Sequence, residues 1–90
     1  MQPTDVRRLE RLRWRSRRGL LELELLLNPF VNLRVVELES ALVDQYEALL
    51  DHEDVDIHEW LLQRNPPPAD VADIVREIRR FLSLDDGPSA

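Results

Sequence analysis

Two arginines, a glycine and a glutamate stand close together near the start of the chain, at Arg17, Arg18, Gly19 and Glu22. Arginine binds carboxylates through two parallel N–H donors, glutamate accepts hydrogen bonds, and glycine lets another chain approach closely. These residues could therefore form a small binding surface. A helix boundary is the alternative, because glycine often ends a helix in the left-handed conformation and arginines suit the negative end of the helix dipole.

A second group of polar residues consists of histidines, aspartates and glutamates, which are residue types that commonly bind metals. Its members are Asp51, His52, Glu53, Asp54, Asp56, His58 and Glu59. Their spacing matches neither HExxH nor a calcium-binding loop, so a solvated turn is the better interpretation. The serines lack the context of a nucleophile elbow, and two glycines are too few for a phosphate-binding loop. These patterns argue against an enzyme.

The net charge of -6 conceals a strong asymmetry along the chain. Residues 1–18 carry a net +5, from seven arginines and two acids, and the remaining residues carry -11. Clustered arginines could contact phosphates, but the acidic remainder and the lack of a known binding motif argue against nucleic acid as a partner. The arginines could instead form a solvated face that pairs with the protein's own acids.

The length and composition restrict the class of protein. Ninety residues suit one domain, which we expect to span residues 1–90. The absence of cysteine excludes disulfides and fits a reducing compartment. No apolar run approaches the roughly 20 residues that span a bilayer, and the N-terminus lacks a secretory signal. We therefore expect a soluble, cytoplasmic protein without membrane insertion.

The hydrophobic spacing predicts helices throughout the chain. The first is expected over 5–18, capped by Thr4 or Asp5, with Gly19 in the left-handed conformation after it. The second is expected over 20–27. Its leucines and glutamates alternate as in a strand, but the lack of β-branched residues favours a helix. Asn28 and Pro29 should bend or end it.

Three further helices follow. One is expected over 39–51, with Leu42, Tyr46, Leu49 and Leu50 inward, and a short one from Asp54 as N-cap. Three prolines at 66–68 force an extended connection, and the last helix should bury a stripe within 71–82. The sequence therefore predicts an all-α fold, a compact bundle of about five short helices that is monomeric. The ordered core should cover about 5–83, followed by a frayed tail over 84–90.

The two tryptophans are expected in different environments. Trp60 has Ile57 and Leu61 at helical spacing and is predicted to lie in the core. Trp14 stands between two arginines, and tryptophan is enriched at binding hot spots. We therefore include Trp14 with Arg17, Arg18, Gly19 and Glu22 among the candidate partner-binding residues.

The string RRGLLEL at residues 17–23 resembles the RGxxE signature of the small FAD assembly factors of succinate dehydrogenase. Further matching positions follow in order over residues 12–82: Pro29 and Phe30, then Tyr46, Leu49 and Leu50 for FxxLL, then Asp54, Asp56, Ile57 and Trp60 for DxDLxxW, then a proline followed by Asp70. The departures are Glu24 for an aspartate, Tyr46 for phenylalanine, Val55 for proline, and three prolines after Asn65 in place of a glycine and one proline. None of them touches the signature.

The resemblance implies a five-helix protein that binds the flavoprotein subunit of succinate dehydrogenase, and in some bacteria fumarate reductase. Such a factor promotes covalent attachment of FAD to a histidine of the client, which carries out the attachment itself. The chain would then be neither an enzyme nor a stable FAD binder. Arg18 and Glu22 would contact the client near its flavin site, and Gly19 would permit close approach. The alternative is a regulatory or antitoxin-like adaptor that binds another protein.

Overall fold

Helices form nearly all of the regular structure in the computed structural model, which describes residues 6–83. The five α-helices in this range are α1 (Val6–Arg15), α2 (Leu21–Leu33), α3 (Ser40–Leu49), α4 (Asp54–Leu61) and α5 (Ala72–Phe81). Short 3-10 turns at Val35–Glu37 and Ala69–Val71 precede α3 and α5. The predicted all-α class and the five helices are confirmed. The predicted caps Thr4 and Asp5 and the predicted frayed tail lie outside the described residues.

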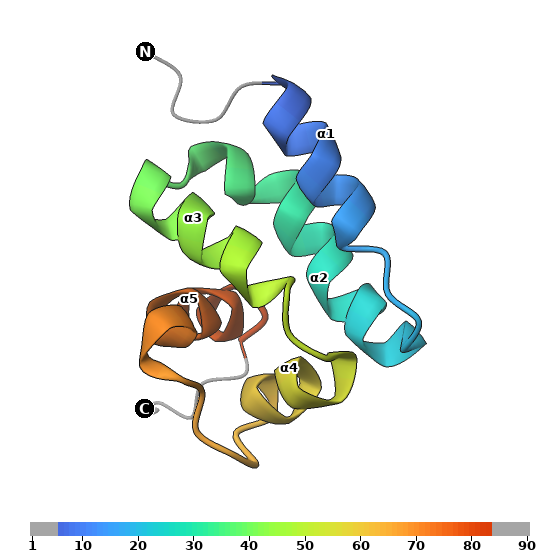
Figure 1. The fold of residues 1–90 in the computed structure, drawn as a ribbon, viewed down its shortest axis with the longest axis vertical. Coiled ribbons are helices and arrows are strands. Elements are labelled where there is room, and N and C mark those ends of the chain that lie inside the picture. The colour runs from blue at the N-terminus through green and yellow to red at the C-terminus, as the bar shows by residue number, and fades with distance from the viewer. Residues whose placement is uncertain (1–5, 84–90) are drawn as a thin grey trace.

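The helix α2 occupies the centre of the arrangement. It contacts α1, α4 and α5, while α3 packs against α5. In Figure 1, α1 and α2 run side by side in opposite directions, and the linker between them turns back close to α4. This linker contains the arginines and the glycine of the sequence motif. The topology therefore presents the motif at one edge of the molecule.

One hydrophobic core joins all five helices. Phe30 of α2 lies within it, with ring centroids 5.7 Å from Tyr46 and 5.5 Å from Phe81. Trp60 is buried, as predicted. The stripe predicted for the last helix is confirmed, since Val71, Ile74, Val75 and Ile78 are buried and Phe81 and Leu82 pack against the core.

Three predicted helix boundaries are wrong. The first helix ends at Arg15, three residues before Arg18, because the chain after it bonds to distant side chains, as described below. The second helix runs through Pro29 to Leu33. Proline disfavours a helix interior, but burial of Phe30 and Val31 directly after Pro29 shows that packing outweighs this preference here.

The third boundary concerns the start of α4. The N-cap is Glu53, which makes no side-chain capping bond, and Asp54 is the first helical residue. Its carboxylate is engaged elsewhere and does not cap the helix. Between residues 6 and 83, no helix is long and apolar enough to cross a membrane.

Candidate partner-binding site

Arg18 holds the linker between α1 and α2 against the loop between α3 and α4. Its Nε donates to Asp54 Oδ1 at 2.7 Å, one terminal nitrogen donates to the carbonyls of Arg15 and Leu50, and the other donates to the carbonyl of His52. The bond to Arg15 also satisfies a carbonyl at the end of α1. We call this set of bonds around Arg18 and Asp54 the arginine clamp.

The backbone of the linker is fixed by carboxylates as well. The N–H of Leu20 donates to Asp54 Oδ2 at 3.0 Å, and the N–H of Arg18 donates to Glu24 Oε1 at 3.0 Å. Burial of the Asp54 carboxyl opposes its ionisation, but the bonds from Arg18 and Leu20 outweigh that effect and lower its pKa below the ordinary range. Asp54 therefore stays ionised and anchors both the guanidinium and the linker backbone.

The Arg18 guanidinium is bound within the protein and is not freely available at the surface. Its side chain is only 12% exposed, and its donors already have acceptors within the protein. Asp54 is the carboxylate that holds it. The sequence does not reveal this partner, because the two residues are 36 positions apart and local spacing predicts Asp54 as a helix cap.

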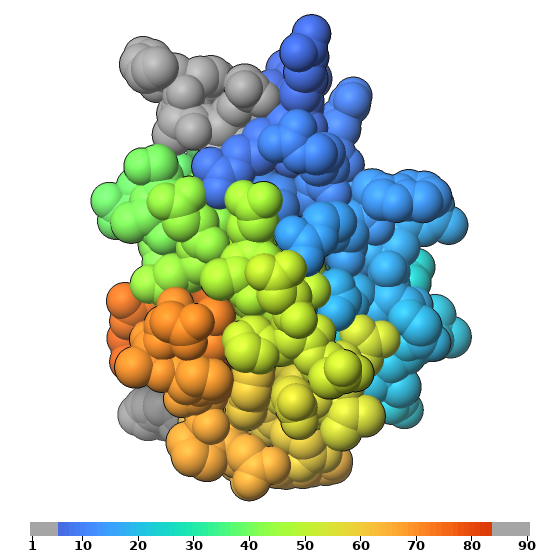
Figure 2. Space-filling view, viewed as in Figure 1, coloured from blue at the N-terminus to red at the C-terminus, as the bar shows by residue number. Residues whose placement is uncertain are grey.

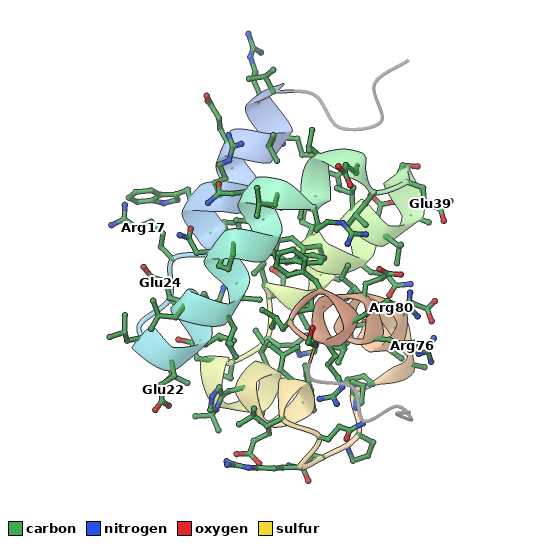
Figure 3. All side chains as sticks on the ribbon, turned by 180° about the vertical axis from the view of Figure 1, so that it is seen from behind. Arg17, Glu22, Glu24, Glu39, Arg76 and Arg80 are labelled. Carbon is green, nitrogen blue, oxygen red and sulfur yellow. The ribbon has the colours of Figure 1, made fainter. Side chains whose placement is uncertain are left out.

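Four other predicted residues lie exposed beside the clamp. They are Trp14, Arg17, Gly19 and Glu22, and exposed Leu21 adjoins them. The Arg17 guanidinium lies 5.2 Å from the ring centroid of Trp14, within the range of a cation–π contact. Figure 3 shows Arg17, Glu22 and Glu24 along the same edge of the molecule. We call Trp14, Arg17, Gly19, Leu21 and Glu22 the linker surface.

Glu22 is the exposed carboxylate of this surface. Its side chain is 73% exposed, in the first turn of α2, and its Oε1 lies 3.9 Å from His58 Nε2 of α4. Leu21 is also mostly exposed, although leucines of amphipathic helices are commonly buried. The alternation of Leu and Glu in this segment was the signal for an exposed apolar residue, because a helix with leucines at successive odd positions cannot bury all of them.

The fold does not require glycine at position 19. Its φ is not positive, so the predicted left-handed conformation is wrong. A Cβ built on it would meet Asp54 Oδ2 at 3.8 Å, an ordinary van der Waals contact. The residue is exposed. Within the described residues, nothing therefore requires position 19 to lack a side chain.

A buried polar pair, Ser16 and Tyr46, lies at the start of the linker. Ser16 Oγ lies 2.6 Å from Tyr46 Oη and donates to the Leu12 carbonyl at 2.7 Å. Burial raises the pKa of Tyr46 above its ordinary range, so this hydroxyl stays protonated. The pair ties the end of α1 to α3. It also explains how tyrosine is accommodated at a position where the resembled family has phenylalanine.

The arginines of α1 pair in part with the acids of α3 and of the loop after it. Arg8 contacts Asp44 and Glu47 at 2.8 and 2.7 Å, and Arg15 contacts Asp51 at 2.6 Å. For Arg8 and Arg15, the interpretation as a face that pairs with the protein's own acids is therefore confirmed. Within residues 6–83, no three histidine, aspartate or glutamate side chains gather closely enough to hold a metal ion.

Comparison with known proteins places these features in a family. The family model described as flavinator of succinate dehydrogenase matches residues 10–82, which include the linker surface and the clamp. A FAD assembly factor SdhE of Pseudomonas aeruginosa is 41% identical over 78 residues, 87% of this chain and 90% of the relative. Proteins of the same name from Legionella pneumophila (strain Paris) and Ralstonia nicotianae are 36% and 37% identical, over 83% and 90% of this chain and 95% and 83% of their own lengths. The chain therefore belongs to the family of flavinators of succinate dehydrogenase.

Proposed function

We propose that this chain is an assembly factor that binds the flavoprotein subunit of succinate dehydrogenase and promotes covalent attachment of FAD to it. Fumarate reductase is the second client to test. Family membership supports the role, and the names of the relatives supply the cofactor and the enzyme. One structural observation supports the site: Gly19 is exposed and its own fold does not require glycine.

The linker surface offers recognition chemistry. Glu22 can accept hydrogen bonds from the client, Trp14 can bury a large apolar area, and Gly19 admits the client backbone. Arg18 acts indirectly, because its bonds hold the linker in shape before the client arrives. A preformed surface loses less conformational entropy on binding than a mobile one.

Promotion of FAD attachment then follows from positioning. In our proposal the factor binds best to a client conformation in which flavin and acceptor histidine are aligned, and so raises the population of that conformation. The client carries out the covalent step, and the assembly factor is no catalyst. FAD remains a ligand of the client.

Co-expression with the flavoprotein tests the proposal. Covalent flavin is measured by its fluorescence in the denatured flavoprotein. The Gly19→Ala and Glu22→Gln variants should lower flavinylation at least about tenfold, a loss equivalent to about 1.4 kcal/mol. Their folding should be unchanged, because the added methyl group has room and Glu22 is exposed.

Glu39→Gln is the matched control. It neutralises another exposed glutamate, at the start of α3 on the opposite edge of the molecule from Glu22 (Figure 3), and it should leave flavinylation unchanged. Full flavinylation with both linker variants would refute the site. Full flavinylation in a strain that lacks the chain would refute the function and leave the adaptor hypothesis.

A further inference from the structure

A groove of about 640 Å³ lies between α4, the connection after it, and α5. Its charged side consists of Arg64, Arg76 and Arg79, and Trp60 and Pro66 contribute apolar surface. None of the described residues that line it is acidic. The protein as a whole carries a net charge of -6, whereas the charged residues that line this groove are all arginines. In Figure 2 the orange atoms of the connection and of the start of α5 lie beside the yellow atoms of α4.

Two of these arginines can turn to a ligand. Arg64 pairs with Glu59 at 3.3 Å and Arg76 pairs with Asp73 at 3.5 Å, and both arginine side chains are about 60% exposed. Solvent-exposed pairs of this kind contribute little to stability, so exchanging one carboxylate for another is easy. Arg79 is buried and donates to the carbonyl of Leu61, so it forms a fixed part of the wall.

The wall opposite α5 is rigid. Pro66, Pro67 and Pro68 restrict the backbone to extended conformations, which lowers the entropy lost when a ligand orders the groove. Just before them, Gln63 has a φ of 61° and ends α4 in a Schellman turn, in which the N–H of Gln63 donates to the Trp60 carbonyl and the N–H of Arg64 donates to the Glu59 carbonyl.

The groove also adjoins the arginine clamp. The Trp60 ring lies edge-on to the His52 ring, with centroids 5.0 Å apart, and the carbonyl of His52 accepts a hydrogen bond from Arg18. Two contacts therefore link the groove to the residue that shapes the linker surface. A partner that covers the linker surface can extend across α4 into the groove.

We propose that this groove is a second docking site for the flavoprotein, and that it receives an acidic segment of that partner which carries an apolar side chain. Guanidinium groups bind carboxylates through paired N–H donors, and the apolar side chain would lie against Trp60 and Pro66. This inference rests on the proposed function, because it assigns the segment to the same client.

The first test measures the affinity of the purified flavoprotein for the full chain at several salt concentrations. The Arg64→Gln/Arg76→Gln double variant should bind at least tenfold more weakly, with a shallower salt dependence. Arg80→Gln is the control, since Arg80 lies on the same helix as Arg76, is equally exposed, pairs with Glu77, and does not line the groove. Figure 3 shows Arg76 and Arg80 projecting from the same helix.

The outcomes separate the two proposals. If the wild-type chain fails to bind the flavoprotein, the proposed function is refuted. If the wild-type chain binds and the double variant binds equally well, the groove assignment alone is refuted. Equal weakening by Arg80→Gln would show a general effect of charge and would also overturn the groove assignment.

The second test identifies the occupant. The chain has no cysteine, so Asn65→Cys places a single thiol at the groove, to which a benzophenone maleimide can be attached. Irradiation of the complex should crosslink it to an acidic segment of the flavoprotein, identified by mass spectrometry. The same label at Glu39→Cys should give no crosslink to that segment. A crosslink from position 65 to a segment without acids, or no crosslink in an intact complex, would refute the proposal.

Discussion

At the scale of single residues, two neighbours in the motif have different roles. Arg18 donates to four acceptors from α1, the α3–α4 loop and α4. Gly19, in contrast, is exposed, and the fold has room for a side chain at its position. The linker surface depends on both of them. Arg18 gives the surface its shape, and Gly19 leaves it open.

The clamp makes stability depend on pH through Asp54. Its pKa is lowered in the folded protein, so its contribution is present above the ordinary aspartate pKa of about 3.9 and is lost as pH falls through the folded value. We expect Asp54→Asn to reduce the free energy of unfolding by about 1.5–3 kcal/mol at pH 7, the range for a hydrogen bond to a charged group. Urea denaturation from pH 7 to pH 2.5 measures the difference between the two proteins, which should shrink below about pH 4. A difference that stays constant over this range would contradict the role of the carboxylate charge.

The sequence could predict which residues of the motif lie exposed, but not the contacts that hold Arg18. Exposure of Trp14 and Glu22 follows from residue type and position. The clamp could not be predicted, because it joins Arg18 to an aspartate and to carbonyls more than 30 residues away. Local spacing predicts Asp54 as a helix cap, but in the structure its carboxylate bonds to Arg18 instead.

At the scale of elements, α2 contains the main conflict between local preference and packing. Pro29 lies inside this helix, where proline removes one backbone hydrogen bond and strains the preceding turn. Phe30 and Val31 are fully buried directly after it, so ending the helix at Asn28 would remove both from the core. Periodicity predicted the existence of all five helices, whereas the boundaries that failed are those set by contacts between elements.

Pro29→Ala tests this balance. Alanine restores the missing N–H donor. It also raises the conformational entropy of the unfolded chain, which lowers the free energy of unfolding by about 0.4–1 kcal/mol. Because an interior proline costs a helix about 3 kcal/mol, we expect a net gain of about 2 kcal/mol in the free energy of unfolding. The measurement is the urea midpoint at constant slope. A lower midpoint would show that Pro29 fits this helix without strain.

At the scale of the whole molecule, the charge asymmetry of the sequence becomes a contact between elements. The basic helix α1 pairs through Arg8 with Asp44 and Glu47 of α3, and through Arg15 with Asp51 just beyond it. Each pair contributes little by itself because these side chains are partly solvated. Together they bring opposite charges of the two chain segments into contact over the core.

The single core predicts unfolding as one unit. Side chains from all five helices belong to one hydrophobic cluster, so helix content and the environment of Trp60 should change at the same urea concentration. Trp14→Phe removes an exposed tryptophan and leaves Trp60 as the sole fluorescent reporter of that type. Fluorescence and circular dichroism curves that coincide would support one domain. Separate midpoints would show that the α4 region unfolds independently.

The adjacency of Arg18 and Gly19 has a consequence for genetics. In saturation mutagenesis that scores protein abundance and activity separately, substitutions at Arg18 should lower both scores, because they remove the bonds that join α1 to the α3–α4 loop. Substitutions of Gly19 by small residues should lower activity alone. A loss-of-function allele at Arg18 is therefore no proof of a lost contact with the client until the amount of protein in the cell has been measured.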